Sequence, residues 1–169
     1  MKTILLTTTV LLGTFALASA QQKKAPASPP AETAATIGGK AVSIKYNSPF
    51  VKGRKIFGGL VPYGQVWRAG ANAATSLHTE AELTIGKLSV PKGDYTLFVL
   101  PEEKEWTLIV NKQTGQWGTE YSQANDLGRV KMTVKPSNGL IESFQITLTD
   151  KALTMQWENT VASVPVKGK

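Results

Sequence analysis

The feature that most constrains the fold of this chain is a hydrophobic period of two residues. Apolar side chains alternate with polar ones in three stretches, at residues 130–135, 143–148 and 153–158. Successive side chains of a β-strand point to opposite faces of a sheet, so each stretch predicts a strand with one buried face. No window of twelve residues shows the period of an amphipathic helix. The pattern therefore predicts an antiparallel, all-β architecture.

Further strands are predicted where apolar residues are more continuous or alternate over shorter runs. Residues 95–100 and 106–110 have the composition of central strands, and an earlier strand is centred on Ile44. Residues 76–85 alternate as one strand if they are unbroken, and residues 149–152 are short enough to close a hairpin. With turn signals about every ten residues, we expect about eight to ten short strands. This predicts a two-layer antiparallel β-sandwich resembling a jelly roll, with a closed β-barrel as the alternative.

The first 20 residues have the layout of a secretory signal peptide. Lys2 gives a positive start, residues 4–17 are uncharged and mostly apolar, and Ala18-Ser19-Ala20 supplies the small residues of a cleavage site. The apolar run is shorter than the roughly 20 residues that a membrane anchor needs, so no membrane span is predicted. No cysteine follows the run, which excludes a lipid-anchored lipoprotein. We expect cleavage after Ala20 and export, with a periplasmic or extracellular product.

Residues 21–36 are predicted to be a disordered leader. They are rich in alanine and proline and contain no large apolar side chain, so they bury too little surface to offset their ordering entropy. Residues 37–169 are then expected to form a single β-sandwich domain, since one core suits this length.

The composition excludes several kinds of site. The chain has no cysteine and one histidine, which rules out disulfides, thiolate zinc sites, cysteine nucleophiles and sites that need two histidines. The glycines fit neither the phosphate-binding loop nor the dinucleotide fingerprint, and no cofactor is predicted. Lys and Arg number 19 against 12 Asp and Glu, but no recognition helix or aromatic RNA-binding motif accompanies them. A nucleic-acid partner is therefore not expected, and the sequence does not indicate an oligomeric state.

Residues 47–75 depart from the strand pattern, and we call them the glycine-rich segment. They hold five glycines and two prolines in 29 residues, together with apolar side chains that require burial. Loops of this length tend to be functional. The segment lies within residues 33–79, which contain no Asp or Glu and six Lys or Arg, against a net charge of +7 for the whole chain. We therefore expect an ordered, sharply turned and basic segment.

This segment is the predicted ligand site of an exported binding or envelope-associated module. The guanidinium group of arginine is a planar fork suited to carboxylate or phosphate oxygens. Aromatic rings beside arginine and asparagine form platforms for sugars and other planar polar ligands. A small anionic or carbohydrate-like ligand is therefore expected, while structural pairing of the arginines is an equal alternative. The predicted ligand-binding residues are Tyr46, Arg54, Tyr63, Trp67, Arg68 and Asn72.

Two other interpretations stay open. His78 and Glu80 share one face of the strand predicted at residues 76–85, so they suit a hydrolase in which His78 is the general base, paired with Glu80 or Asp126. The same pattern is also an ordinary polar strand face, and no metal site is predicted from it. The last interpretation is a purely structural envelope protein, in which internal carboxylates neutralise both arginines.

Three stretches together resemble a known family. Residues 51–75 read VKGRKIFGGLVPYGQVWRAGANAAT, residues 90–101 read VPKGDYTLFVLP, and residues 106–118 read WTLIVNKQTGQWG. With the neighbourhood of Asp126 and Arg129, their order and spacing resemble a secreted bacterial family known as domain of unknown function 2911. The resemblance covers essentially the whole mature domain. It implies an exported, mostly β protein and carries over no established activity.

One position departs from the family pattern. The family's first motif often reads Thr-Gly-Ala-Asn-Glu-Ala-Thr, and this chain has alanine in place of the glutamate, at Ala73. A mechanism that would use that glutamate as an acid or base is therefore not implied for this chain.

Overall fold

The structure is a computed structural model and describes residues 27–169. The predicted signal peptide, residues 1–20, and the first part of the predicted leader lie outside the described residues. Between residues 27 and 169, no helix has the length and hydropathy that a membrane crossing requires. The one helical turn in that part of the chain is a 3₁₀ turn at Gln123–Asn125.

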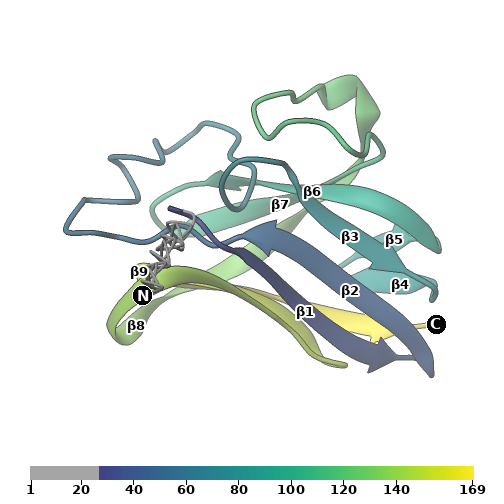
Figure 1. Cartoon of the computed structure of the whole chain (residues 1–169). Coiled ribbons are helices and arrows are strands. Elements are labelled where there is room, and N and C mark those ends of the chain that lie inside the picture. The colour runs from purple at the N-terminus through teal and green to yellow at the C-terminus, as the bar shows by residue number, and fades with distance from the viewer. Residues whose placement is uncertain (1–26) are drawn as a thin grey trace, which may run out of the picture.

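Nine strands make up most of the described chain. They are β1 (Pro30–Ile37), β2 (Lys40–Asn47), β3 (Thr75–Thr79), β4 (Leu83–Ile85), β5 (Leu88–Val90), β6 (Gly93–Pro101), β7 (Glu105–Asn111), β8 (Asp126–Leu148) and β9 (Ala152–Gly168). They form one antiparallel sheet in the order β1-β2-β3-β6-β7-β8-β9-β4-β5 (Figure 1). The all-β prediction is therefore confirmed, although β8 and β9 are far longer than the short strands expected.

The long strands β8 and β9 fold this sheet into two layers. Residues 126–133 of β8 pair with β7, and residues 133–148 pair with β9. The β8–β9 register shifts between Pro136 and Ile141 and again before Gln145, and such irregularities bend a ribbon. Figure 1 shows the β8–β9 ribbon running below β1 and β2. The predicted sandwich is confirmed and the closed barrel is wrong, because β1 and β5 remain the edges of the sheet.

The core lies between the two layers, and its largest fully buried side chains include Trp106, Phe144 and Trp157. Strands β6 and β7 lie near the middle of the sheet, as their continuous apolar runs predict. These runs arise because both faces of the strands are covered. Phe98 of β6 lies on the face of the strand opposite the core. It is nevertheless fully buried, because it packs edge-on against Tyr121 with ring centroids 5.1 Å apart.

Part of the predicted leader is a strand instead. Disorder was predicted to residue 36, whereas Pro30–Ile37 forms β1 and pairs with β2 along its whole length. Small side chains suffice here because an edge strand is held mainly by its backbone hydrogen bonds. The folded part of the chain therefore begins before the position that the sequence predicts.

The strand predicted at residues 76–85 is also broken. Strand β3 ends at Thr79, whose hydroxyl donates to the carbonyl of Ala81 at 2.8 Å and accepts its N–H at 3.1 Å. Such bonds offer the backbone a local alternative to the ladder. The chain then turns, and β4 pairs with β5 and β9. The hairpin predicted at residues 149–152 is present, closed by the hydrogen bond from Thr149 N–H to the Ala152 carbonyl at 2.9 Å.

Side-chain hydroxyls join the two layers along one side of the sandwich. The N–H of Leu148 in β8 donates to the Thr33 hydroxyl of β1 at 3.1 Å. The N–H of Ile146 donates to the Tyr46 hydroxyl of β2 at 3.0 Å. We call this contact the β8 seam. It satisfies strand amides that have no neighbouring strand on that side.

Candidate functional site

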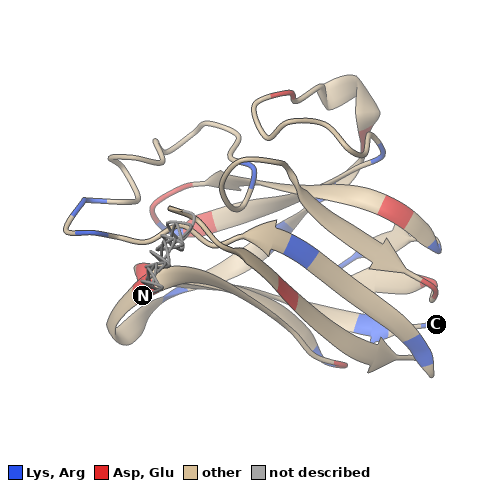
Figure 2. Ribbon diagram, in the orientation of Figure 1, with Lys and Arg blue, Asp and Glu red and all other residues tan. Residues whose placement is uncertain are grey.

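The glycine-rich segment, residues 47–75, connects β2 to β3 and is fixed to both layers. Near its start, Val51 N–H donates to the Glu142 carbonyl of β8 at 2.7 Å. Further along, Trp67 exchanges two backbone hydrogen bonds with Val99 of β6, at 2.7 and 2.8 Å. The segment is therefore ordered, as predicted. Figure 2 shows basic residues and no acidic residue along its loops.

Two glutamates hold the backbone of the segment. The Glu142 carboxylate accepts the N–H of Lys52 at 2.9 Å. The Glu158 carboxylate accepts the N–H groups of Ile56 and Phe57, at 3.2 and 3.4 Å. Neither carboxylate forms an ion pair with an arginine of the segment. These two carboxylates therefore fix the backbone of the loop, and among the described residues neither neutralises a guanidinium group of the segment.

Trp67 anchors the segment in the core. Its ring stacks on that of Trp157, with centroids 5.7 Å apart and planes 18° apart, and meets Phe144 edge-on at 5.0 Å. Its indole N–H donates to the Gly70 carbonyl at 3.0 Å. These contacts fix the ring, and its remaining surface borders a cavity.

This cavity, which we call the arginine cavity, has a volume of about 380 Å³. Three of the six predicted ligand-binding residues line it, together with a further lysine and a second tryptophan. Among the described residues, no Asp, Glu or His lines it. Its charged and large apolar walls are formed by Lys52, Arg54, Leu60, Trp67, Arg68 and Trp157.

Arg68 is the unsatisfied group of this cavity. Its side chain is partly buried, and its shielded Nε atom has no hydrogen-bond partner among residues 27–169. Burial lowers the pKa of the Arg68 guanidinium, because desolvation disfavours the charged form. The stem packs against Gly118, where an added Cβ would overlap Arg68 Cδ. A side chain held in this way keeps its charge and lacks a compensating anion.

Arg54, by contrast, is largely used by its own loop. Its Nε donates to the Val51 carbonyl at 3.0 Å, and a terminal nitrogen donates to the Phe50 carbonyl at 2.5 Å. The guanidinium therefore closes the turn and contributes positive charge to the cavity wall. The alternative of backbone pairing holds for this arginine and not for Arg68.

Three predicted residues lie away from the arginine cavity. The Tyr46 ring packs edge-on against Phe144 at 5.7 Å, and its hydroxyl belongs to the β8 seam. Tyr63 is partly exposed, and burial of part of its ring raises the pKa of its hydroxyl. Asn72 is exposed with a left-handed backbone (φ 58°), and its carbonyl accepts the N–H of Gly118 at 3.1 Å.

The histidine lies on the outer face of the sheet. His78 Nδ1 is 2.7 Å from Asp94 Oδ1, and Ser43 is its register partner on the other side. The carboxylate partner is thus neither Glu80 nor Asp126. The side chains of His78 and Asp94 are 52% and 69% exposed, so this pair offers no enclosed place for a substrate. Within residues 27–169, no group of three or more potential ligands is placed to hold a metal ion.

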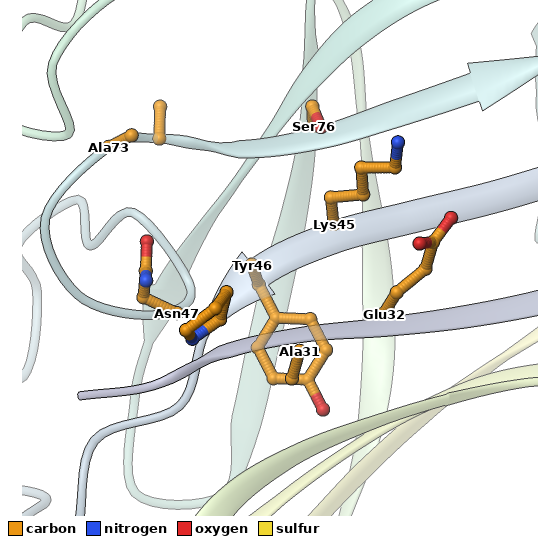
Figure 3. Close-up of a pocket in the computed structure, with 9 residues that line it drawn as sticks. Ala31, Glu32, Lys45, Tyr46, Asn47, Ala73 and Ser76 are labelled. Carbon is orange, nitrogen blue, oxygen red and sulfur yellow. The ribbon is translucent and has the colours of Figure 1, made fainter. Parts of the chain in front are cut away.

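A second hollow, of about 460 Å³, lies on the same outer face, and we call it the outer groove (Figure 3). Of the predicted ligand residues, only Tyr46 borders it, and Figure 3 shows the Tyr46 ring pointing away from Lys45 and Ser76. The labelled side chains that line the groove are Ala31, Glu32, Lys45, Tyr46, Asn47, Ala73 and Ser76.

Comparison with known proteins places the chain in a family. The model of the family described as Protein of unknown function (DUF2911) matches residues 28–166. The chain belongs to the DUF2911 family. No curated protein and no solved structure matches it. The family resemblance inferred from the sequence is therefore confirmed, and the DUF2911 match includes all of β1.

Sequence reasoning missed several residues of the arginine cavity and of its supports in this DUF2911 protein. Trp157 belongs to the alternating stretch 153–158 and lies in the core, as that pattern predicts, but it also lines the arginine cavity. Lys52 carried no signal beyond its charge. Glu142 and Glu158 lie about 90 to 100 residues from the amides that they bind, and no local pattern connects them.

Proposed function

We propose that this protein is an exported binding module whose arginine cavity holds a small anionic ligand with a ring, such as a sugar acid. The observation that carries the proposal is Arg68, which lines a cavity, forms no ion pair within the described chain, and has a shielded Nε atom without an acceptor there. Buried charges in proteins are normally paired, so an unpaired one at a cavity favours an anionic ligand.

The rest of the wall supports the same ligand chemistry. Lys52 and Arg54 add positive charge, and a carboxylate or phosphate gains charge-assisted hydrogen bonds from such groups. The rings of Trp67 and Trp157 offer apolar surface to the body of the ligand. The volume of about 380 Å³ lies within the range of small-molecule sites.

Binding is proposed here in place of catalysis because the wall lacks an acid–base pair. No carboxylate or histidine lines the arginine cavity within the described chain. The exposed His78–Asp94 pair lies on the outer face and is not among the residues that line it. Export rests on the signal-peptide pattern of residues 1–20 and would bring the cavity into contact with extracytoplasmic sugar acids and other small anions.

The test is calorimetric titration with glucuronate, benzoate and inorganic phosphate, with glucose as the neutral control. We expect at least one anion to bind, glucose to bind more weakly, and Arg68→Gln to weaken anion binding at least about tenfold because a charged donor is lost. Lys55→Gln, an exposed basic residue of the same segment that does not line the cavity, should leave affinity within about twofold.

Thermal unfolding of Arg68→Gln separates binding from folding. A folded variant with lost affinity supports the proposal. If none of the three anions binds the wild type at about 1 mM, or if Arg68→Gln binds them equally well, the proposed function is wrong.

A further inference from the structure

Trp117 is an exposed tryptophan, and its surroundings point to a second site. Its relative exposure is 53%, whereas Trp106 and Trp157 are 1% exposed. Tryptophan is highly buried on average, so a ring left in solvent is informative when the backbone holds it in place. Trp117 lies in the connection between β7 and β8. Figure 1 shows this connection above β6 and β7, away from the β8–β9 ribbon.

The backbone around Trp117 is fixed on both sides. The carbonyl of Gln116 accepts the N–H of Ala74 at 3.3 Å, and the N–H of Gly118 donates to the Asn72 carbonyl at 3.1 Å. The Gln116 side chain is buried, and its Oε1 accepts from the Thr96 hydroxyl at 3.4 Å. The exposed ring is therefore displayed from an anchored backbone, which lowers the entropy cost of binding through it.

The outer groove reaches the bridge partner of Trp117. Ala73 pairs with Trp117 in an isolated antiparallel bridge, and directly opposed residues of such a pair point to the same face. Ala73 and its neighbour Ala74 also line the outer groove of about 460 Å³. Ala73, a small residue, therefore connects Trp117 to the groove.

The floor of the groove carries both hydrogen-bond donors and hydrogen-bond acceptors. Ser76, Lys45 and Glu32 are register partners on β3, β2 and β1, so they form a row with roughly 4.8 Å between neighbours. Asn47 adds an amide at the end of β2, and its nitrogen already donates to the Ser28 carbonyl at 3.3 Å. Lys45 and Glu32 do not form an ion pair with each other in the described chain, and their charges cancel across the groove.

We propose that Trp117 and the outer groove bind a neutral glycan chain of gluco-configured, β-1,4-linked sugars. A pyranose whose hydroxyls are all equatorial has a flat C–H face that stacks on an indole ring. Its hydroxyls both donate and accept hydrogen bonds, which matches the mixed row of Ser76, Lys45 and Glu32. This site shares no lining residue with the arginine cavity, although the Arg68 stem packs against Gly118 beside Trp117.

The test is titration of the full-length exported protein with cellohexaose and chitohexaose, with the helical maltohexaose as the control for chain shape. We expect the β-1,4 oligosaccharides to bind more tightly than maltohexaose. Trp117→Ala should weaken their binding about tenfold or more, because the stacking surface of the indole ring is lost. Trp117→Phe should retain part of the affinity, because a smaller ring restores part of that surface.

Two controls make the result specific. Leu140 is 64% exposed on β8 and does not line the outer groove, so Leu140→Ala should bind as the wild type does. Lys52→Gln, which removes a charge from the wall of the arginine cavity, should also leave oligosaccharide affinity within about twofold, which separates this site from the anion site. The proposal is overturned if neither β-1,4 oligosaccharide binds, or if Trp117→Ala binds them as well as the wild type does.

Discussion

At the scale of the residue, the two arginines of the glycine-rich segment show how neighbours decide a side chain's role. Arg54 bonds to two carbonyls of its own turn, whereas Arg68 lies against Gly118 and its Nε atom has no acceptor within residues 27–169. Both lie near a glycine and an aromatic residue in the sequence, so composition did not separate them. Only the path of the backbone places carbonyls near one guanidinium and a cavity beside the other.

Gly118 is the residue whose replacement should be felt most directly. A Cβ there would overlap Arg68 Cδ and stand 2.6 Å from the Asn72 carbonyl oxygen, which is backbone and cannot easily retreat. We expect Gly118→Ala to lower the free energy of unfolding by about 1–3 kcal/mol, measured by urea denaturation. Gly139→Ala is the matched control, since an added Cβ meets nothing within 4 Å there. Equal stability of the two variants would contradict the close packing at Gly118.

At the scale of the element, the strands with clear patterns were predictable and the irregular contacts were not. The period of two located β9 and both halves of β8, and continuous apolar runs located β6 and β7. Strand β1 was missed because its small side chains leave no apolar signal and its stability comes from pairing with β2. The break after Thr79 was missed because a hydroxyl bond to the backbone has no periodic signature.

The β8 seam provides the test at this scale. Tyr46→Phe keeps the ring against Phe144 and removes the hydroxyl that accepts the N–H of Ile146. A partly buried amide is then left without a partner, and we expect a loss of about 1–2 kcal/mol in urea denaturation. Tyr63→Phe, on a partly exposed ring with no hydrogen bond to the described chain, should change stability by less than about 0.5 kcal/mol.

At the scale of the whole molecule, an open sheet behaves as a sandwich because two long strands carry it around the core. The alternation of the sequence predicted two layers, but the strand order could not be predicted, since it depends on bends at the β8–β9 register shifts. The candidate site, too, was predictable only in part. Basic charge and glycine content marked the right segment, while the partners Glu142 and Glu158 come from distant parts of β8 and β9.

The position of β1 makes a prediction for the whole chain. A protein that begins at residue 27 keeps all nine strands, whereas one that begins at residue 38 loses β1 and its contact with Leu148. We expect the shorter protein to lose about 3 kcal/mol or more, because an eight-residue strand of hydrogen bonds is removed and the edge of β2 is exposed. Thermal and urea unfolding of both proteins measures this. Equal stability of the two proteins would show that residues 30–36 contribute little to folding, as expected of a leader.

The β8 seam has a consequence for motion in the molecule. Beside the seam, the Phe144 N–H donates to the Pro49 carbonyl at 2.8 Å, but at the seam itself the amides of Ile146 and Leu148 bond to two hydroxyl groups that can rotate away. Opening there breaks two bonds and no ladder, so it requires less than global unfolding. These two amide protons should exchange with deuterated solvent earlier than those of the central strands, which makes this side the line along which the sandwich first parts.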